Sequence, residues 1–238
     1  MRILTLKRFI AAAVFFLLFP ALLLAGCGGT KTNPVTQLEQ QLQKEPEYAI
    51  ILNDMKEEGN FFPTYYHQYR VDIGEESKTY PFVEVNESYY RKNQPYLGMV
   101  LASKTADGKV SHTPFPNGYQ YVGNPQYGNW RTDSNGNSFW EFYGKYMLLS
   151  QVMHWAGGGL GRNYYNTYSS YQANRRPFMG PRGEYGTNGS ITRKQKPNFY
   201  ARRQMRKARS TGRFQDKINR RIGRSKNTFR SRGFRFGK

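Results

Sequence analysis

The chain has 238 residues, with 36 Lys and Arg against 16 Asp and Glu, and a formal net charge of +20 at pH 7. This length allows one or two ordinary domains, and a single cysteine excludes an internal disulfide bond. Charge is divided unevenly, because residues 27–155 carry 11 basic and 14 acidic side chains, whereas residues 156–238 carry 22 and 2. The expected organisation is therefore a mildly acidic body followed by a strongly basic tail.

The first 26 residues have the order of a secretory signal. Arg2, Lys7 and Arg8 precede an apolar run over residues 9–25, and small residues follow the run. The run leads into Leu-Ala-Gly-Cys at residues 24–27, which resembles the lipobox of bacterial lipoproteins. An uncleaved membrane helix is the alternative, because a helix needs roughly 17–25 apolar residues to cross a bilayer.

The lipobox resemblance implies a membrane-anchored protein. It implies cleavage before Cys27, acylation of the Cys27 thiol and acylation of the new amino group. Two or more acyl chains, palmitate among them, hold a protein stably on a bilayer. Gly28 follows the cysteine, and in Gram-negative members of the class this implies the outer membrane, facing the periplasm.

Residues 27–46 have the composition of a linker, and residues 35–44 could form a polar helix. The body then extends over residues 47–155. Its first element is predicted to be a helix at residues 47–58, where Tyr, Ile, Leu and Met recur at helical spacing before a glycine.

Three strands are predicted next, at residues 65–73, 80–90 and 96–103, from strand-favouring residues that alternate with polar ones. Asp107-Gly108 is a hairpin-turn signal, so residues 109–113 are expected to pair back on the third strand.

Residues 114–137 are rich in Gly, Pro and Asn, which favours an irregular loop. The loop carries Tyr119, Tyr121, Tyr127 and Trp130. These rings either cap the adjoining sheet or stack on a ligand such as a glycan.

Ser138 and Glu141 match a capping box, which predicts a helix from residue 138 to about residue 155. Its broad apolar face favours burial in the core, with a position on the lipid surface as the alternative. The predicted fold is α+β, with a small antiparallel sheet packed against two or three helices. Residues 118–125 and 138–146 are also similar to the signature of an uncharacterised bacterial lipoprotein family, to which no activity is attached.

Residues 156–238 are predicted to be a long disordered basic tail, because net charge is high and apolar residues are few. Two segments have helical character, residues 199–209 and the basic amphipathic stretch 214–222. The candidate anion-binding residues are Arg202, Arg203, Arg206, Lys207, Arg209, Arg213, Lys217, Arg220, Arg221 and Arg224.

The basic tail predicts an anionic partner, either acidic lipid, cell-wall polymer or an acidic protein. Arginines interleaved with aromatic residues also occur in nucleic-acid binders, and that alternative requires either a leader that is not cleaved or a tail that acts on extracellular DNA. A solvated charge run without a partner is the third possibility.

Catalytic motifs are missing from the sequence. His67, His112 and His154 lie in separate elements without metal-ligand spacing, and no cofactor-binding motif is present. Paired carboxylates could cleave a glycan, so an enzyme remains an alternative. The favoured prediction is a non-enzymatic envelope lipoprotein, a tether or accessory subunit anchored through Cys27 and binding through its tail.

Overall fold

The computed structural model describes residues 33–59, 62–74, 76–146 and 161–222. The elements, in chain order and with η for 3-10 helices, are α2 (Pro34–Gln41), β1 (Tyr48–Glu58), β2 (Thr64–Ile73), β3 (Glu76–Thr79), β4 (Val83–Val85), α3 (Glu87–Asn93), η2 (Gln94–Tyr96), β5 (Met99–Lys104), β6 (Val110–Ser111), β7 (Phe115–Pro116), η3 (Tyr119–Tyr121), β8 (Gly128–Thr132), β9 (Ser138–Phe142), η4 (Gly144–Tyr146), α5 (Arg162–Ala173), α6 (Ser190–Gln195) and α7 (Pro197–Ile222). The α+β class is confirmed.

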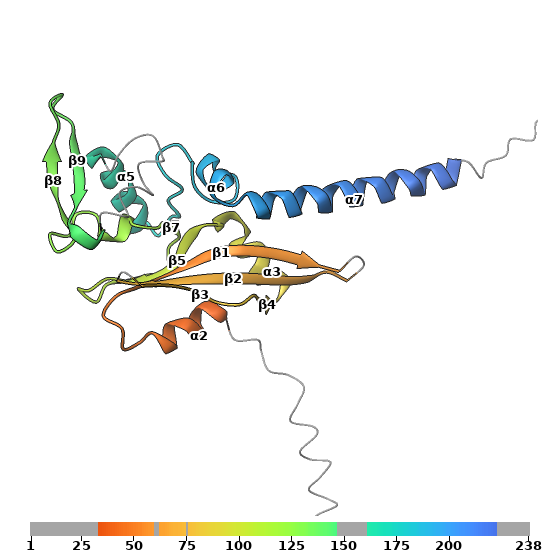
Figure 1. Ribbon diagram of the computed structural model, residues 1–238, viewed down its shortest axis with the longest axis horizontal. Helices are drawn as coiled ribbons and strands as arrows, with labels where there is room; N and C mark the ends of the chain where they lie inside the picture. The colour runs from red at the N-terminus through yellow and green to blue at the C-terminus, as the bar shows by residue number, and fades with distance from the viewer. Residues whose placement is uncertain (1–32, 60–61, 75, 147–160, 223–238) are drawn as a thin grey trace, which may run out of the picture.

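The main sheet is antiparallel and has β1 at its centre. Its strand order is β3-β2-β1-β5-β6, with β4 also paired to β2 and β7 also paired to β5. A separate hairpin of β8 and β9 stands at one end of the molecule (Figure 1). Helix α2 lies on one side of the main sheet, and α5, α6 and α7 lie on the other (Figure 1).

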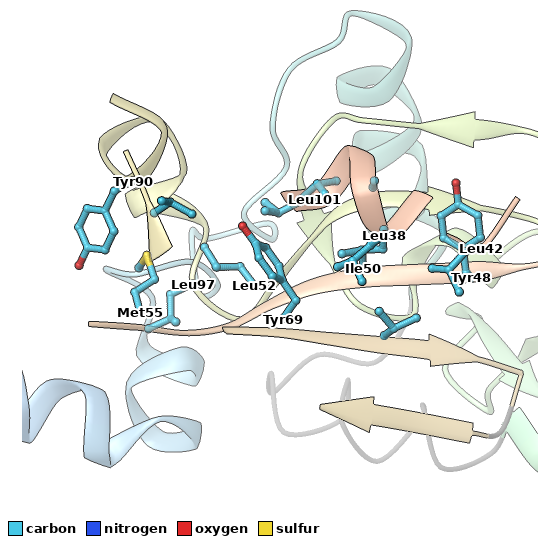
Figure 2. Close-up of a cluster of buried hydrophobic side chains, with 14 of the residues drawn as sticks. Leu38, Leu42, Tyr48, Ile50, Leu52, Met55, Tyr69, Tyr90, Leu97 and Leu101 are labelled. Carbon is cyan, nitrogen blue, oxygen red and sulfur yellow. The ribbon is translucent and has the colours of Figure 1, made fainter. Parts of the chain in front are cut away.

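Two hydrophobic clusters form the core on opposite faces of β1. Ile50 and Leu52 face the first cluster, where Leu38 of α2 packs against the sheet (Figure 2). Ala49 and Ile51 face the second cluster, which holds the rings of the aromatic loop. Because β1 is covered on both faces, five consecutive residues from Tyr48 to Leu52 are buried.

The predicted helix at residues 47–58 is wrong, because this segment is strand β1. A continuous apolar run fits a fully buried strand as well as a helix. In addition, a β-bulge lies between Leu52 and Asp54, and the extra residue puts Leu52 and Met55 on the same face. Their spacing of three, which suggested a helix, comes from that bulge.

The predicted helix from residue 138 is also wrong over its described part. Ser138–Phe142 is strand β9, which pairs with β8 so that Trp140 lies opposite Trp130. Trp140 and Phe142 are buried and Glu141 is exposed, which is the period of two that a strand requires. Residues 147–155 lie outside the described residues.

Other predicted elements agree with the structure at least in part. The polar helix corresponds to α2, the first predicted strand to β2 and the third to β5. The turn at Gly108 has φ +80°, and β6 pairs back on β5 as expected. The second predicted strand is shorter, since only β4 is extended and Asn86 then caps α3 by accepting from the Tyr89 amide at 2.7 Å.

The prediction of a disordered tail from residue 156 is wrong for residues 162–222, where α5, α6 and α7 form. Phe178 is buried in the second cluster and Phe199 in the first, while Tyr185 and Ile191 pack with Met99. Burying each large apolar side chain contributes roughly 1.5–3 kcal/mol. A few isolated apolar residues are therefore sufficient to hold residues 162–222 packed against the sheet.

Candidate anion-binding site

Helix α7 begins at the body, and residues of its first turn pack against the body and form hydrogen bonds with it. Pro197 starts the helix directly after Lys196, the C-cap residue of α6. Phe199 is buried in the core, and the Tyr200 hydroxyl donates to the carbonyl of Thr187 at 2.6 Å. The start of α7 is therefore held by both apolar and polar contacts.

The second and third turns of α7 dock on acidic residues of β1. Arg202 Nη2 lies 2.6 Å from both carboxylate oxygens of Asp54. Arg206 Nε lies 3.1 Å from a carboxylate oxygen of Glu57, and its Nη1 donates to the Glu57 carbonyl at 2.7 Å. We call Arg202 and Arg206 the inner pair. Both ion pairs are partly exposed, so each contributes at most about 1 kcal/mol.

Lys196 adds a third cation beside the inner pair. Its Nζ donates to Asn53 Oδ1 at 2.5 Å. Burial lowers the pKa of Lys196, and the nearby positive charge of Arg70 lowers it further, against the opposing effect of Asp54. The region where α7 leaves the body therefore brings three cations beside Asp54 and Glu57.

The basic residues continue along the same face of α7 beyond the body. Arg209, Arg213, Lys217 and Arg220 follow the inner pair at spacings of three and four residues, which place side chains on one face of a helix. We call these four residues the outer stripe. Strand β1 ends at Glu58, and α7 extends past the end of the sheet (Figure 1).

The outer stripe lacks the acidic partners of the inner pair. Within the described part of the chain, its four residues form no salt bridge, and neither do Arg203, Lys207 and Arg221. Helix α7 carries nine basic residues and one acidic residue, Asp216. The structure therefore leaves seven of the ten predicted anion-binding residues on α7 without a salt bridge, although Asp216 lies three residues after Arg213 and four before Arg220. Arg224 lies outside the described residues.

A groove of about 730 Å³ lies between α7 and the end of β1. Met55, Tyr90 and Phe199 contribute its apolar part, whereas Arg203 and Arg209 are among its basic residues. Burial raises the pKa of Tyr90, and the negative charge of Glu57 raises it further. The Tyr90 hydroxyl therefore stays neutral in the groove at physiological pH.

The aromatic loop does not offer the ring faces that glycan stacking needs. Tyr119, Tyr121 and Tyr127 are buried in the second cluster. Trp130 is half-buried, with Trp140 5.2 Å away between ring centroids and the Arg162 guanidinium 4.9 Å from its ring centre. This placement favours the expected alternative that the rings cap the sheet, and it is an argument against a glycan-binding loop.

Sequence reasoning missed the acidic residues that position these elements. Asp54 and Glu57 lie in the segment for which the sequence predicts a helix, so the sequence gives no indication of their contacts with α7. Glu47 is buried and accepts hydrogen bonds from Tyr127 at 2.6 Å and Tyr146 at 2.9 Å. The one sequence feature that could have indicated a buried carboxylate is the position of Glu47 directly before an apolar run.

The two described histidines do not form a metal site. His67 is fully buried and its Nδ1 lies 2.9 Å from the Tyr69 hydroxyl. His112 Nε2 lies 2.8 Å from a carboxylate oxygen of Glu39. Among the described residues, no group of three or more His, Cys, Asp and Glu is placed to hold a metal ion. His154 lies outside them.

Comparison with known proteins gives no assignment, because no family model, curated protein or solved structure matches this chain. In the parts of the chain that the structure describes, no helix is both long enough and apolar enough to cross a membrane. Cys27 and the apolar run before it are not among those parts.

Proposed function

We propose that the protein is a non-enzymatic tether of the bacterial envelope, in which Cys27 carries the membrane anchor and α7 binds an anionic component. The anchor rests on the lipobox resemblance of residues 24–27. Such an anchor places the body at the cell membrane, or on the periplasmic side of the outer membrane in a Gram-negative host. There the tail meets anionic lipid, cell-wall polymer or acidic protein.

The observation that carries the proposal is the continuation of one basic face of α7 from β1 into solvent. The body neutralises the inner pair with Asp54 and Glu57. Like charges three or four residues apart on a helix cost roughly 0.2–0.5 kcal/mol a pair, and the outer stripe contains several such pairs. An external anion would remove this repulsion just as the two carboxylates do at the body.

The positions of α2 and α7 on the two sides of the sheet support a tether. Helix α2, which follows the linker from Cys27, lies on the opposite side of the sheet from α7 (Figures 1 and 2). The two sequence features that suggest attachment therefore connect to opposite faces of one sheet. A molecule built this way can hold its anchor and its anionic partner apart.

The test uses residues 28–238, which contain every described helix and strand and carry no acyl chain. Heparin on a column serves as the polyanion. Replacing all four residues of the outer stripe with Gln preserves helix propensity and removes four charges. We expect the variant to elute at much lower salt, with the slope of log affinity against log salt reduced by about 3, if each contact contributes as a nucleic-acid phosphate does.

The matched control removes four charges from the body, through Lys44→Gln, Lys78→Gln, Lys92→Gln and Lys109→Gln, all at exposed residues. It should elute close to wild type. Circular dichroism verifies that α7 is intact in both variants. An outer-stripe variant that elutes with wild type would remove the role of α7 from the proposal.

A further inference from the structure

We infer that the projecting end of the molecule rests on the surface of an anionic lipid bilayer. This inference builds on the proposed function of α7 and names the partner class. It adds a second observation to the charge of the outer stripe, namely that exposed apolar side chains accompany the cations at this end.

Two of these apolar side chains lie on the projecting half of α7. Phe214 is 64% exposed and Ile218 is 37% exposed, and they lie one turn apart on the helix. At helical spacing Lys207 and Arg221 lie on the same strip of the helix as Phe214, about two turns before and after it, while Lys217 is the residue of the outer stripe nearest to that strip. Long basic side chains next to an apolar strip can reach phosphate while the apolar groups enter the lipid.

The third apolar side chain comes from a distant part of the sequence. Phe62, in the connection from β1 to β2, is 90% exposed. Strand β1 ends and β2 begins at the end of the sheet past which α7 projects (Figure 1). Glu58 and Gly59 at the end of β1 border the same groove as Arg209 and Arg213, so the two elements are close in space.

A bilayer explains this combination better than a soluble polyanion does. Attraction to a polyanion needs only the cations, and it leaves exposed Phe and Ile in water. Interfacial helices combine basic and apolar residues because the first bind acidic headgroups and the second enter the boundary of the acyl chains. The chemistry at this end therefore fits a surface that is both anionic and apolar beneath its headgroups.

The experiment distinguishes insertion of apolar side chains into the bilayer from electrostatic attraction to its headgroups. Residues 28–238 are sedimented with vesicles of phosphatidylglycerol and phosphatidylcholine, and with vesicles of phosphatidylcholine alone. The triple variant Phe62→Ser, Phe214→Ser, Ile218→Ser keeps every charge. We expect its affinity for the anionic vesicles to fall by about tenfold or more, since each side chain loses apolar burial, while its elution from heparin stays as in wild type.

A control replaces exposed apolar residues elsewhere, through Val110→Ser and Tyr143→Ser, which are 48% and 47% exposed in the wild type. It should bind the anionic vesicles as wild type does. A second measurement uses Phe214→Trp, whose fluorescence should shift to the blue on anionic vesicles but not on phosphatidylcholine vesicles or soluble polyphosphate.

The outcomes distinguish the two proposals. A triple variant that binds anionic vesicles like wild type overturns the bilayer inference, and so does a Phe214→Trp fluorescence maximum that does not shift. Neither result affects the proposed tether function. Polyphosphate that binds as tightly as vesicles at equal phosphate concentration overturns the bilayer inference as well. An outer-stripe variant with wild-type binding to both heparin and vesicles overturns the bilayer inference together with the role of α7 in the tether.

Discussion

At the scale of single residues, His67 links stability to pH. It is fully buried, its ring lies 5.3 Å from that of Tyr90 between centroids, and within the described residues its Nε2 has no hydrogen-bond partner. Burial lowers the pKa of His67 to about 4, whereas an unfolded histidine titrates near 6.5. The folded protein therefore binds fewer protons than the unfolded chain between these two values.

The free energy of unfolding should consequently fall as the pH drops from about 6.5 to about 4. Above pH 6.5 the contribution of His67 to this free energy should be complete. One pKa unit corresponds to about 1.4 kcal/mol, so the loss attributable to His67 is about 3 kcal/mol by pH 4. Urea unfolding across this range measures it. His67→Phe should have a flatter pH dependence than wild type.

His112 provides the control for this prediction, because it is exposed and lies in the connection between β6 and β7. His112→Gln should keep the wild-type slope. If His67→Phe and wild type lose free energy of unfolding in parallel, then burial of His67 does not govern the acid sensitivity.

At the scale of elements, the β8–β9 hairpin requires a glycine at its base. A Cβ atom on Gly128 would lie within van der Waals overlap of the Glu141 carbonyl and 2.8 Å from the Trp140 ring. Backbone on the paired strand cannot move aside without breaking the pairing of Gly128 with Phe142. Gly128→Ala should therefore destabilise the protein by roughly 1–3 kcal/mol, as overpacking does, measured by urea unfolding.

A matched substitution in α7 should act in the opposite direction. Gly212 lies in the helix, and a Cβ there would meet nothing within 4 Å. Because Ala is favoured over Gly in a helix interior by up to about 1 kcal/mol, Gly212→Ala should increase the helicity of α7. If both substitutions changed the free energy of unfolding equally, this would contradict the conclusion that a Cβ atom is too close to its neighbours at Gly128 and unhindered at Gly212.

At the scale of the whole molecule, the proposed anchor at Cys27 predicts where the protein resides. Cys27→Ser removes the thiol that would be acylated, so the variant should move from the membrane fraction to the soluble fraction or stay as an unprocessed precursor. Mass spectrometry of the wild-type N-terminus should show an acylated residue 27. A wild-type chain that keeps Met1 would contradict the anchor and make nucleic acid the leading partner for α7.

The local pattern predicted β2, the Gly108 turn and α2 correctly, because alternation, turn chemistry and a capped polar helix depend on neighbouring residues. It was wrong for β1, since burial on both faces and a bulge conceal the strand period. It was wrong for β9, since the pairing with β8 outweighs the capping box at Ser138. These errors concern segments whose state is decided by partners distant in the sequence.

The order of residues alone shows the charge division, the resemblance at residues 24–27 and the concentration of candidate anion-binding residues in the last third of the chain, because none of these depends on folding. Which of these cations are already paired depends on the folded arrangement of the chain. Asp54 and Glu57 reach α7 through the pairing of β1, almost 150 residues earlier in the chain. Burial of Phe199 then directs the helix past the sheet, and this is why the outer stripe remains open to an external anion.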